Sequence, residues 1–242
     1  MRRMLLLAGM IVASVLASAS PAAARSATVC NGVLTGKTIS RDLTVPPGAA
    51  CRIVNSVVRG DVKIRGRAYF QGTHATIRGD VTAKRAQTVF LDGGSLVRGD
   101  VVTDRTPQVY VFASTIRGGI DVSRTTDSVN VCGNTVRNDI RIERSGRDIL
   151  VGDPLTIDCP GNNVVQRGNI ELENNFTDVE FVVSGNRIDK GNLTVRLNRG
   201  PSAKFVQSNR GGRRIVCSGN TAPFTVSGNI GWLTRAGQCA TP

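Results

Sequence analysis

The sequence predicts an all-β protein folded as a parallel β-helix, or β-solenoid, with about 20 residues per coil. Three observations lead to this fold. A short phrase recurs at a fixed period, apolar and polar residues alternate within it, and its apolar sites are mostly β-branched. The clearest copies are Val58-Arg59-Gly60-Asp61-Val62, Ile77-Arg78-Gly79-Asp80-Val81 and Val97-Arg98-Gly99-Asp100-Val101.

The period is most regular over the first half of the chain. The four-residue units begin at residues 40, 59, 78, 98, 117, 137, 167, 190 and 227, so the first five steps are 19, 19, 20, 19 and 20 residues. Nine units predict nine coils stacked about 4.8 Å apart, in a rod on the order of 45 Å long. The crossover rule favours a right-handed solenoid. The alternative is a β-sandwich, but sandwich strands do not keep one register over six copies.

Alternation predicts which residues face the core. With the repeat arginine as position zero, the residues at −3, −1, +3 and +5 should point inward. Gly at +1 is expected to let the strand bend without a side chain striking the core. Arg at zero and Asp at +2 are expected to point outward and to pair in alternating ladders that soften like-charge repulsion, although each exposed pair contributes little. A continuous apolar seam is predicted along Val62, Val81, Val101, Ile120, Ile140 and Ile170.

A second strand is predicted about ten residues later in each coil. It is visible at Thr88-Val89-Phe90-Leu91, at Gln108-Val109-Tyr110-Val111-Phe112 and at Ser128-Val129-Asn130-Val131. No stretch after residue 24 shows the periodicity of an amphipathic helix. The ten aromatic residues look scattered and partly inward, so few platforms for stacking sugars are expected.

Residues 1–24 are predicted to be a secretory signal peptide. Arg2 and Arg3 give it a basic start, and an apolar run over residues 5–16 is too short to span a bilayer. Ala22 and Ala24 fit the −3 and −1 sites of cleavage before residue 25, and a cut after Ala19 is the alternative.

Residues 25–242 are expected to form a single elongated domain that is exported, with no membrane span. Loss of the two arginines in the leader lowers the formal net charge from +13 to +11. The coils lengthen after residue 140. Loops that interrupt the repeat are predicted at Asp153-Pro154, at Cys159-Pro160-Gly161-Asn162-Asn163, and from Arg199-Gly200-Pro201 to Arg210-Gly211-Gly212-Arg213-Arg214.

Six cysteines follow the leader, namely Cys30, Cys51, Cys132, Cys159, Cys217 and Cys239. An even number behind a signal peptide predicts disulfides, although sequence alone allows about fifteen pairings. The solenoid favours sequential pairing, because the first and last pairs are each separated by about one coil. The outer bridges would cap a first coil, residues 30–51, and a last segment, residues 217–239. Zinc is the weaker alternative, since there is no Cys-x-x-Cys pair and one histidine.

A basic row is the main candidate site. Arg85, Arg105, Arg124 and Arg144 recur at +7, in the turn after the repeated strand; Arg65 and Arg67 flank the same place one coil earlier, and Lys84 adjoins it. Stacked coils would place a positive charge about every 5 Å along the rod. Such an array suits a linear polyanion: an acidic polysaccharide, a teichoic-acid-like polymer or a nucleic acid. A solvated surface without a ligand is the alternative.

These observations predict a non-enzymatic rod of the cell envelope or extracellular space, acting as a structural or binding module. A polysaccharide lyase or hydrolase on a parallel β-helix is the alternative. No Asp-Asp dipeptide offers paired acid and base groups, and His74 is the single histidine. We expect no metal or cofactor. Calcium is the alternative near the long loops, although no calcium-binding loop motif is present there; its candidate ligands are Asp158, Glu171, Glu173 and Asp178.

Short motifs at both ends of the domain suggest a family. They are Cys30-Asn31-Gly32-Val33, Val45-Pro46-Pro47-Gly48-Ala49-Ala50-Cys51, Cys217-Ser218-Gly219-Asn220 and Gly237-Gln238-Cys239. The chain resembles a group of uncharacterised exported actinobacterial parallel β-helix repeat proteins, which carry Gly-Asn-Val and Gly-Asp-Val repeats between terminal cysteines. The resemblance implies fold and export but no catalytic residue. A fainter likeness is to bactofilins, which are polymer-forming β-solenoids, cytosolic and without these cysteines.

Overall fold

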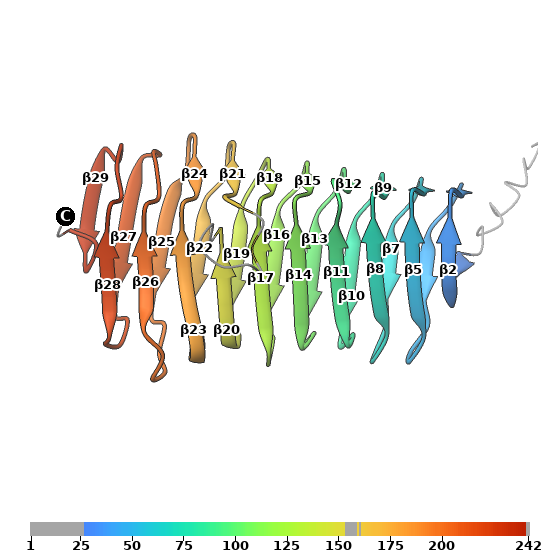
Figure 1. The fold of residues 1–242 in the computed structure, drawn as a ribbon, viewed down its shortest axis with the longest axis horizontal. Coiled ribbons are helices and arrows are strands. Elements are labelled where there is room, and N and C mark those ends of the chain that lie inside the picture. The colour runs from blue at the N-terminus through green and yellow to red at the C-terminus, as the bar shows by residue number, and fades with distance from the viewer. Residues whose placement is uncertain (1–26, 153–158, 160, 241–242) are drawn as a thin grey trace, which may run out of the picture.

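Short parallel strands wind this chain into a solenoid of stacked coils, as the repeat predicts (Figure 1). The structure is a computed structural model, and it describes residues 27–152, 159 and 161–240. The predicted signal peptide, residues 1–24, lies outside these residues. Within them, no helix is long and apolar enough to cross a membrane.

Three parallel sheets, which we name A, B and C, run along the rod. Sheet A contains β1 (Thr28–Val29), β4 (Leu43–Val45), β7 (Val62–Ile64), β10 (Val81–Lys84), β13 (Val101–Asp104), β16 (Ile120–Ser123), β19 (Ile140–Glu143), β22 (Ile170–Glu173), β25 (Asn192–Arg196), β27 (Arg214–Ser218) and β29 (Thr234–Gly237). Sheet B contains β2 (Gly32–Thr35), β5 (Ala50–Val54), β8 (Tyr69–Thr73), β11 (Thr88–Asp92), β14 (Gln108–Phe112), β17 (Ser128–Cys132), β20 (Gly146–Val151), β23 (Phe176–Ser184), β26 (Lys204–Gln207) and β28 (Phe224–Ser227). Sheet C contains the two-residue strands β3 (Thr38–Ile39), β6 (Val57–Val58), β9 (Thr76–Ile77), β12 (Leu96–Val97), β15 (Thr115–Ile116), β18 (Thr135–Val136), β21 (Val164–Val165) and β24 (Arg187–Ile188).

The repeated phrase spans a corner between two sheets. Val58 ends a strand of sheet C, the next three residues turn the chain, and Val62 begins a strand of sheet A. The second predicted strand is sheet B, and its position is confirmed in β11, β14 and β17. Each coil up to β24 therefore contributes one strand to each sheet, in the order C, A, B.

The rod contains about ten turns rather than the nine expected. The additional coil is the stretch from residue 199 to 214, which the sequence predicted to be an interruption. It contains β26, and Arg210 forms parallel bridges with Arg187 before it and Ile230 after it. The period was hidden there because no Arg-Gly-Asp-like unit marks the corner.

The predicted apolar seam is confirmed, and it continues beyond the six residues first recognised. Val62, Val81, Val101, Ile120, Ile140 and Ile170 occupy one register position in neighbouring strands of sheet A, and all are buried. Leu193 and Ile215 extend it toward the C-terminus. Burial of such apolar surface is the main force that favours folding.

Two buried amide ladders run through the later coils. Asn134, Asn163, Asn186, Asn209 and Asn229 form one at the corner between sheets B and C, and Asn175, Asn198, Asn220 and Gln238 form the other between sheets A and B. Each asparagine accepts hydrogen bonds from its neighbour through one amide oxygen and donates through its nitrogen. Stacked amides of this kind satisfy buried polar groups along a cross-β array.

Lys204 is an exception to the apolar interior. It has no solvent exposure and shares its register with Phe181 and Phe224. Its ammonium group donates to the carbonyl oxygens of Gly200 and Ser202, each at 2.9 Å. Burial lowers the pKa of Lys204, because loss of water disfavours the charged form.

The cysteines pair sequentially, as predicted. Cα atoms are 5.5 Å apart in Cys30–Cys51, 5.3 Å in Cys132–Cys159 and 5.0 Å in Cys217–Cys239. The two outer bridges belong to the main core, whereas the middle one packs with Leu150 and Val182 in a smaller cluster. Residues 153–158 and 160, where one long loop was predicted, lie outside the described part of the chain.

Replacing Asn198 with alanine tests the contribution of an amide ladder. The change removes the acceptor for both the backbone N–H and the side-chain amide of Asn175, at 3.2 and 2.8 Å, and leaves Leu172 O without its donor. We expect the free energy of unfolding, measured by urea denaturation, to fall by roughly 3 kcal/mol. Asn138→Ala is the control, because that side chain is exposed and should change stability little. Equal effects of the two substitutions would contradict a stabilising ladder.

Candidate polyanion-binding surface

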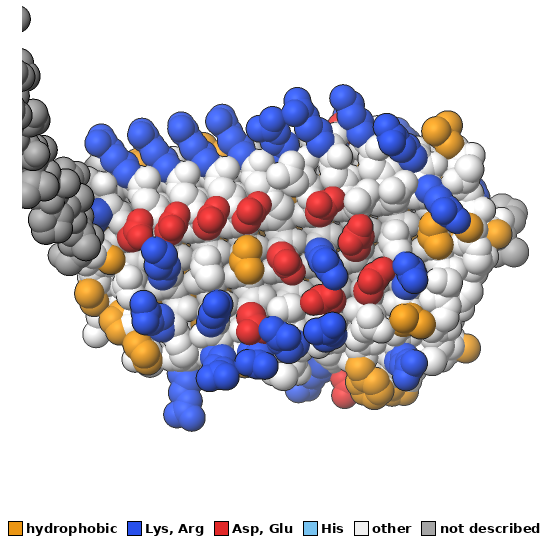
Figure 2. Space-filling view, turned by 180° about the vertical axis from the view of Figure 1, so that it is seen from behind, with side chains coloured by type: hydrophobic (Ala, Val, Ile, Leu, Met, Phe, Trp, Pro, Cys, Tyr) orange, Lys and Arg blue, Asp and Glu red, His pale blue; other side chains and the backbone are white. Residues whose placement is uncertain are grey.

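Five arginines line the corner between sheets C and A in consecutive coils. We name Arg59, Arg78, Arg98, Arg117 and Arg137 the arginine comb. Each follows a strand of sheet C, and its backbone N–H donates to a carbonyl oxygen of the preceding coil at 2.8–2.9 Å. All five are exposed. Figure 2 shows basic side chains projecting along one long edge of the rod, parallel to a row of acidic side chains.

The expected pairing of these arginines with the repeat aspartates is wrong. The carboxylate oxygens of Asp42, Asp61 and Asp80 instead accept the backbone N–H of the aspartate in the next coil, at 3.0, 3.1 and 2.8 Å. Asp100 accepts the Gly119 N–H in the same way, at 2.7 Å. Across the described residues, none of the ion pairs involves the comb.

The repeat glycine is required for a reason other than the predicted one. A Cβ added to Gly99 would lie 1.9 Å from Asp80 Oδ1 and 2.8 Å from the carbonyl carbon of Gly79. Gly79 and Gly118 stand equally close to the carboxylates of the coils before them. The glycine therefore makes room for the aspartate and backbone of the preceding coil, not for the core.

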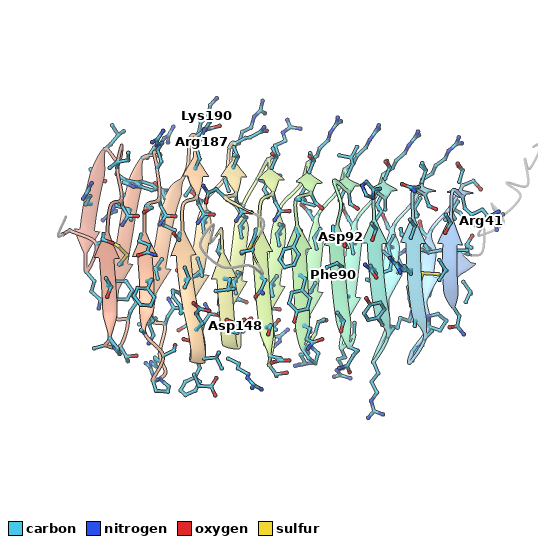
Figure 3. The ribbon with its side chains drawn as sticks, viewed as in Figure 1. Arg41, Phe90, Asp92, Asp148, Arg187 and Lys190 are labelled. Carbon is cyan, nitrogen blue, oxygen red and sulfur yellow. A yellow bond between two sulfur atoms is a disulfide. The ribbon has the colours of Figure 1, made fainter. Side chains whose placement is uncertain are left out.

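At both ends of the comb, residues other than arginine occupy the position that follows the sheet C strand. Ser40 takes the equivalent place before Arg59, because Ile39 pairs with Val58. After Arg137, pairing of Val136 with Val165 and of Val165 with Ile188 brings Gln166 and Asp189 to this position. Arg167 and Lys190, which the repeat had aligned with the comb, follow one residue later. Figure 3 shows Lys190 and Arg187 together near β24 and Arg41 toward the other end of the rod.

The basic row predicted at +7 is brought together at the opposite edge of sheet A. Arg67, Arg85, Arg105, Arg124 and Arg144, which we name the turn row, all adopt positive φ angles of 50–58°. Their backbone N–H groups donate to the next coil at 2.6–3.2 Å. A left-handed conformation costs a residue with a side chain roughly 1 kcal/mol, so glycine or asparagine would suit this turn better.

Acidic residues lie among the arginines of the turn row. The Arg124 guanidinium contacts the Asp104 carboxylate at 2.6 Å. Lys84, which ends β10, pairs in register with Asp104, and Ser123 pairs with Glu143 in the same column. Arg65 lies just after β7 and is exposed, as is Lys84. The predicted residues therefore share one edge of the rod, with carboxylates among them.

One ion pair perturbs the titration of its members. A hydrogen bond from the Lys63 ammonium, 2.7 Å away, lowers the pKa of Asp42 below its ordinary 3.8, and the Asp61 N–H lowers it further. The same contact raises the pKa of Lys63. Both side chains are well exposed, so water screens the attraction.

A small acidic notch lies on the outer face of sheet A. It forms where Gly119 replaces the repeat aspartate, has a volume of about 290 Å³, and is lined by Asp100, Asp121, Asp139 and Arg141 among others. Burial raises the pKa of the Asp121 carboxyl, and Glu143 and Asp100 reinforce the shift against the attraction of Arg141. The sequence did not predict this grouping, because these acids come from three different coils.

Among the described residues, no three His, Cys, Asp or Glu side chains gather closely enough to hold a metal ion. Glu171 and Glu173 lie on β22, where Glu173 contacts Arg196 at 3.6 Å. Asp178 is exposed on β23. Asp158 lies outside the described residues.

The sequence suggested that the aromatic residues are scattered, but three of them form a cluster. Phe90, Tyr110 and Phe112 cluster on the outer face of sheet B, with ring centroids 5.6–5.9 Å apart. The signal for this cluster was present, since Phe90 and Tyr110 occupy polar-facing positions of the second strand. Contact between these rings depends on the register between coils, which pairs Phe90 with Tyr110.

Comparison of the chain with protein-family models, with curated proteins and with solved structures finds no match. The resemblance to exported actinobacterial repeat proteins therefore stays a prediction.

Replacing Gly99 with alanine tests the close approach at the repeat corner. We expect a large loss of stability, on the order of 2 kcal/mol or more, because the new methyl group meets backbone atoms that cannot move freely. Gly66→Ala is the matched control: its Cβ would find its nearest neighbour at 3.8 Å. Thermal unfolding of both variants measures the difference. A Gly99→Ala protein as stable as Gly66→Ala would refute the steric explanation.

The shifted pKa of Asp42 predicts a dependence of stability on pH. A carboxyl group whose pKa is lower in the folded state stabilises the protein above its unfolded pKa, and this contribution disappears as pH falls through the folded value. We expect unfolding free energy to fall below about pH 4, and to fall less in Asp42→Asn. Urea titrations at several pH values measure both slopes. Identical slopes in parent and variant would show that Asp42 is not linked to folding.

Proposed function

We propose that this protein is an exported, non-enzymatic rod that binds linear polyanions along a basic ladder. Export follows from the predicted leader, and the three disulfides are typical of oxidising compartments. The observation that supports binding most strongly is the arginine comb. Its five exposed guanidinium groups stand in one register without ion pairs among the described residues.

The comb is suited to a repeating anionic chain. The sheet places its arginines one strand spacing apart, about 4.8 Å, so the positions of the charges are set before a ligand arrives. At this distance two unit charges repel by about 1 kcal/mol in water, and a bound polyanion would relieve that repulsion. Arginine also presents a planar fork that matches carboxylate and phosphate groups.

The turn row is the second contributor to this proposal. Five coils keep arginine at a backbone conformation that glycine or asparagine adopts with less strain, which favours a role for the guanidinium group. The two rows lie at opposite edges of sheet A. Nearby carboxylates, and the Arg124–Asp104 contact, make the turn row the weaker of the two.

A polysaccharide lyase or hydrolase is the second candidate function. The acidic notch favours it, because Asp121 combines a raised pKa with neighbouring carboxylates and Arg141. Release of unsaturated sugars or reducing ends from an acidic polysaccharide, abolished by Asp121→Asn, would support this function over the binding rod.

Substitution of all five comb arginines with glutamine tests the main proposal. These side chains point outward, so we expect an unchanged circular dichroism spectrum and at least about tenfold weaker binding to polygalacturonate, polyphosphate and a single-stranded oligonucleotide. The slope of log affinity against log salt for the oligonucleotide should fall by about 3.5, which corresponds to five phosphate contacts on a single strand. Fluorescence anisotropy with labelled polymers provides the measurement.

The matched control replaces Arg67, Arg85, Arg105, Arg124 and Arg144 with glutamine. It removes the same charge from the other edge, so a purely nonspecific attraction would weaken equally in both variants. We expect the comb variant to lose more. Equal affinities of the two variants, or no binding by the parent at low salt, would refute the comb as the binding surface.

A further inference from the structure

The outer face of sheet B contains an aromatic surface that the proposed function does not use. Phe90 on β11 and Tyr110 on β14 are register partners, and Phe112 lies two residues beyond Tyr110 on the same face. The Phe90 ring meets Tyr110 at 63° and Phe112 at 87°. All three side chains are partly exposed. Figure 3 shows Phe90 and Asp92 on the face of the rod that sheet B forms.

A hollow of about 410 Å³ opens beside these rings. Its lining consists of Phe90, Tyr110, Phe112, Ser128, Asn130 and Asp148. The polar members come from β17 and β20, the two strands that follow the aromatic ones in the sheet. This size and mixture, apolar rings with a few polar groups, are typical of small-ligand sites.

Asn130 provides an observation independent of the aromatic cluster. This residue is 5% exposed, yet its Oδ1 has no hydrogen-bond partner among the described residues. An unpaired buried amide oxygen costs roughly 1–3 kcal/mol, so such atoms are rare unless a ligand or water satisfies them. Register pairing places Asn130 directly beside Tyr110. The unsatisfied acceptor and the aromatic face therefore border the same hollow.

The other polar groups at the hollow define what it could bind. The Asp148 carboxylate and the Ser128 hydroxyl line it, and Ser128 pairs in register with Asp148. Gln108, the register partner of Ser128, accepts a hydrogen bond from Thr88 and donates one to Asp127, each at 3.1 Å. The lining of the hollow is thus rich in acceptors, and the Asp148 carboxylate disfavours an anionic ligand.

We propose that this hollow binds a neutral pyranose unit of a saccharide. The apolar face of the sugar ring would lie on Tyr110 and Phe90, and its hydroxyl groups would donate to Asn130 Oδ1 and the Asp148 carboxylate. Hydroxyl donors satisfy the buried acceptor, and an aromatic surface contacts the C–H face of the ring. Cross-strand stabilisation explains the aromatic cluster alone but leaves Asn130 unsatisfied.

The site lies on a different sheet from the comb and takes an uncharged ligand. The rod would therefore have two independent binding surfaces: a basic edge for a polyanion and an aromatic hollow for a neutral sugar. Failure of either proposal can be recognised separately, because their ligands and variants differ.

Binding of neutral oligosaccharides tests the inference. Gluco-, manno-, xylo- and N-acetylglucosamine oligomers are titrated into the folded protein by isothermal calorimetry. We expect saturable binding of at least one of them, weakened at least about tenfold by Tyr110→Ala and by Asn130→Leu, which keeps volume but removes the acceptor. Tyr69→Ala is the matched control, since Tyr69 is an exposed aromatic residue of β8 outside the hollow. It should bind as the parent does.

Specificity is checked with the two sets of variants. The comb variant should retain saccharide binding, and Tyr110→Ala should retain polyanion binding. Absence of binding to every neutral oligomer, or full binding by both Tyr110→Ala and Asn130→Leu, would overturn the inference. Thermal unfolding of each variant confirms that lost binding is not lost folding.

Discussion

Backbone hydrogen bonding in a single register is the constraint on which this structure depends. Each coil lies one strand spacing from the next, so a side chain at a given position meets the same position of its two neighbours. Apolar residues are stabilised by this repetition, because each packs on similar residues of the neighbouring coils, as the seam through Val62 and Ile120 shows. Amides gain as well, because each asparagine can accept from one neighbour and donate to the other. Like charges stacked at one register position instead repel each other.

The repeated aspartates and the repeated arginines differ in their contacts. The aspartates of the repeat bind backbone N–H groups of the following coil, and the repeat glycine provides the space for these contacts. Their carboxylates therefore hold successive corners together. The arginines two positions earlier are left exposed and without ion pairs among the described residues, which makes one edge of sheet A basic although acidic residues lie close in sequence.

The coils are not equivalent along the rod. The comb and the aspartate contacts belong to the regular N-terminal half, whereas the later coils rely on amide ladders, on a buried lysine and on the middle Cys132–Cys159 bridge. The aromatic hollow lies between these two parts of the rod, on β11 to β20. The residues that we propose to bind ligands therefore lie at outward positions of the most regular coils, where the backbone fixes their spacing and little ordering is needed on binding.

The sequence by itself determined the β-solenoid, its period, the apolar seam and the pairing of the cysteines, because these follow from repetition and alternation along the chain. Tertiary structure decided which atoms meet between coils. It showed that Asp80 caps a backbone N–H instead of pairing with an arginine, that Gly99 makes room for the preceding coil, and that residues 199–214 form a coil. It also brought Phe90, Tyr110 and Asn130 to one hollow and three aspartates to one notch. Such contacts join residues about 20 positions apart, and one extra residue at a corner, as at Gln166, changes which side chain follows the strand there; local patterns cannot specify these contacts.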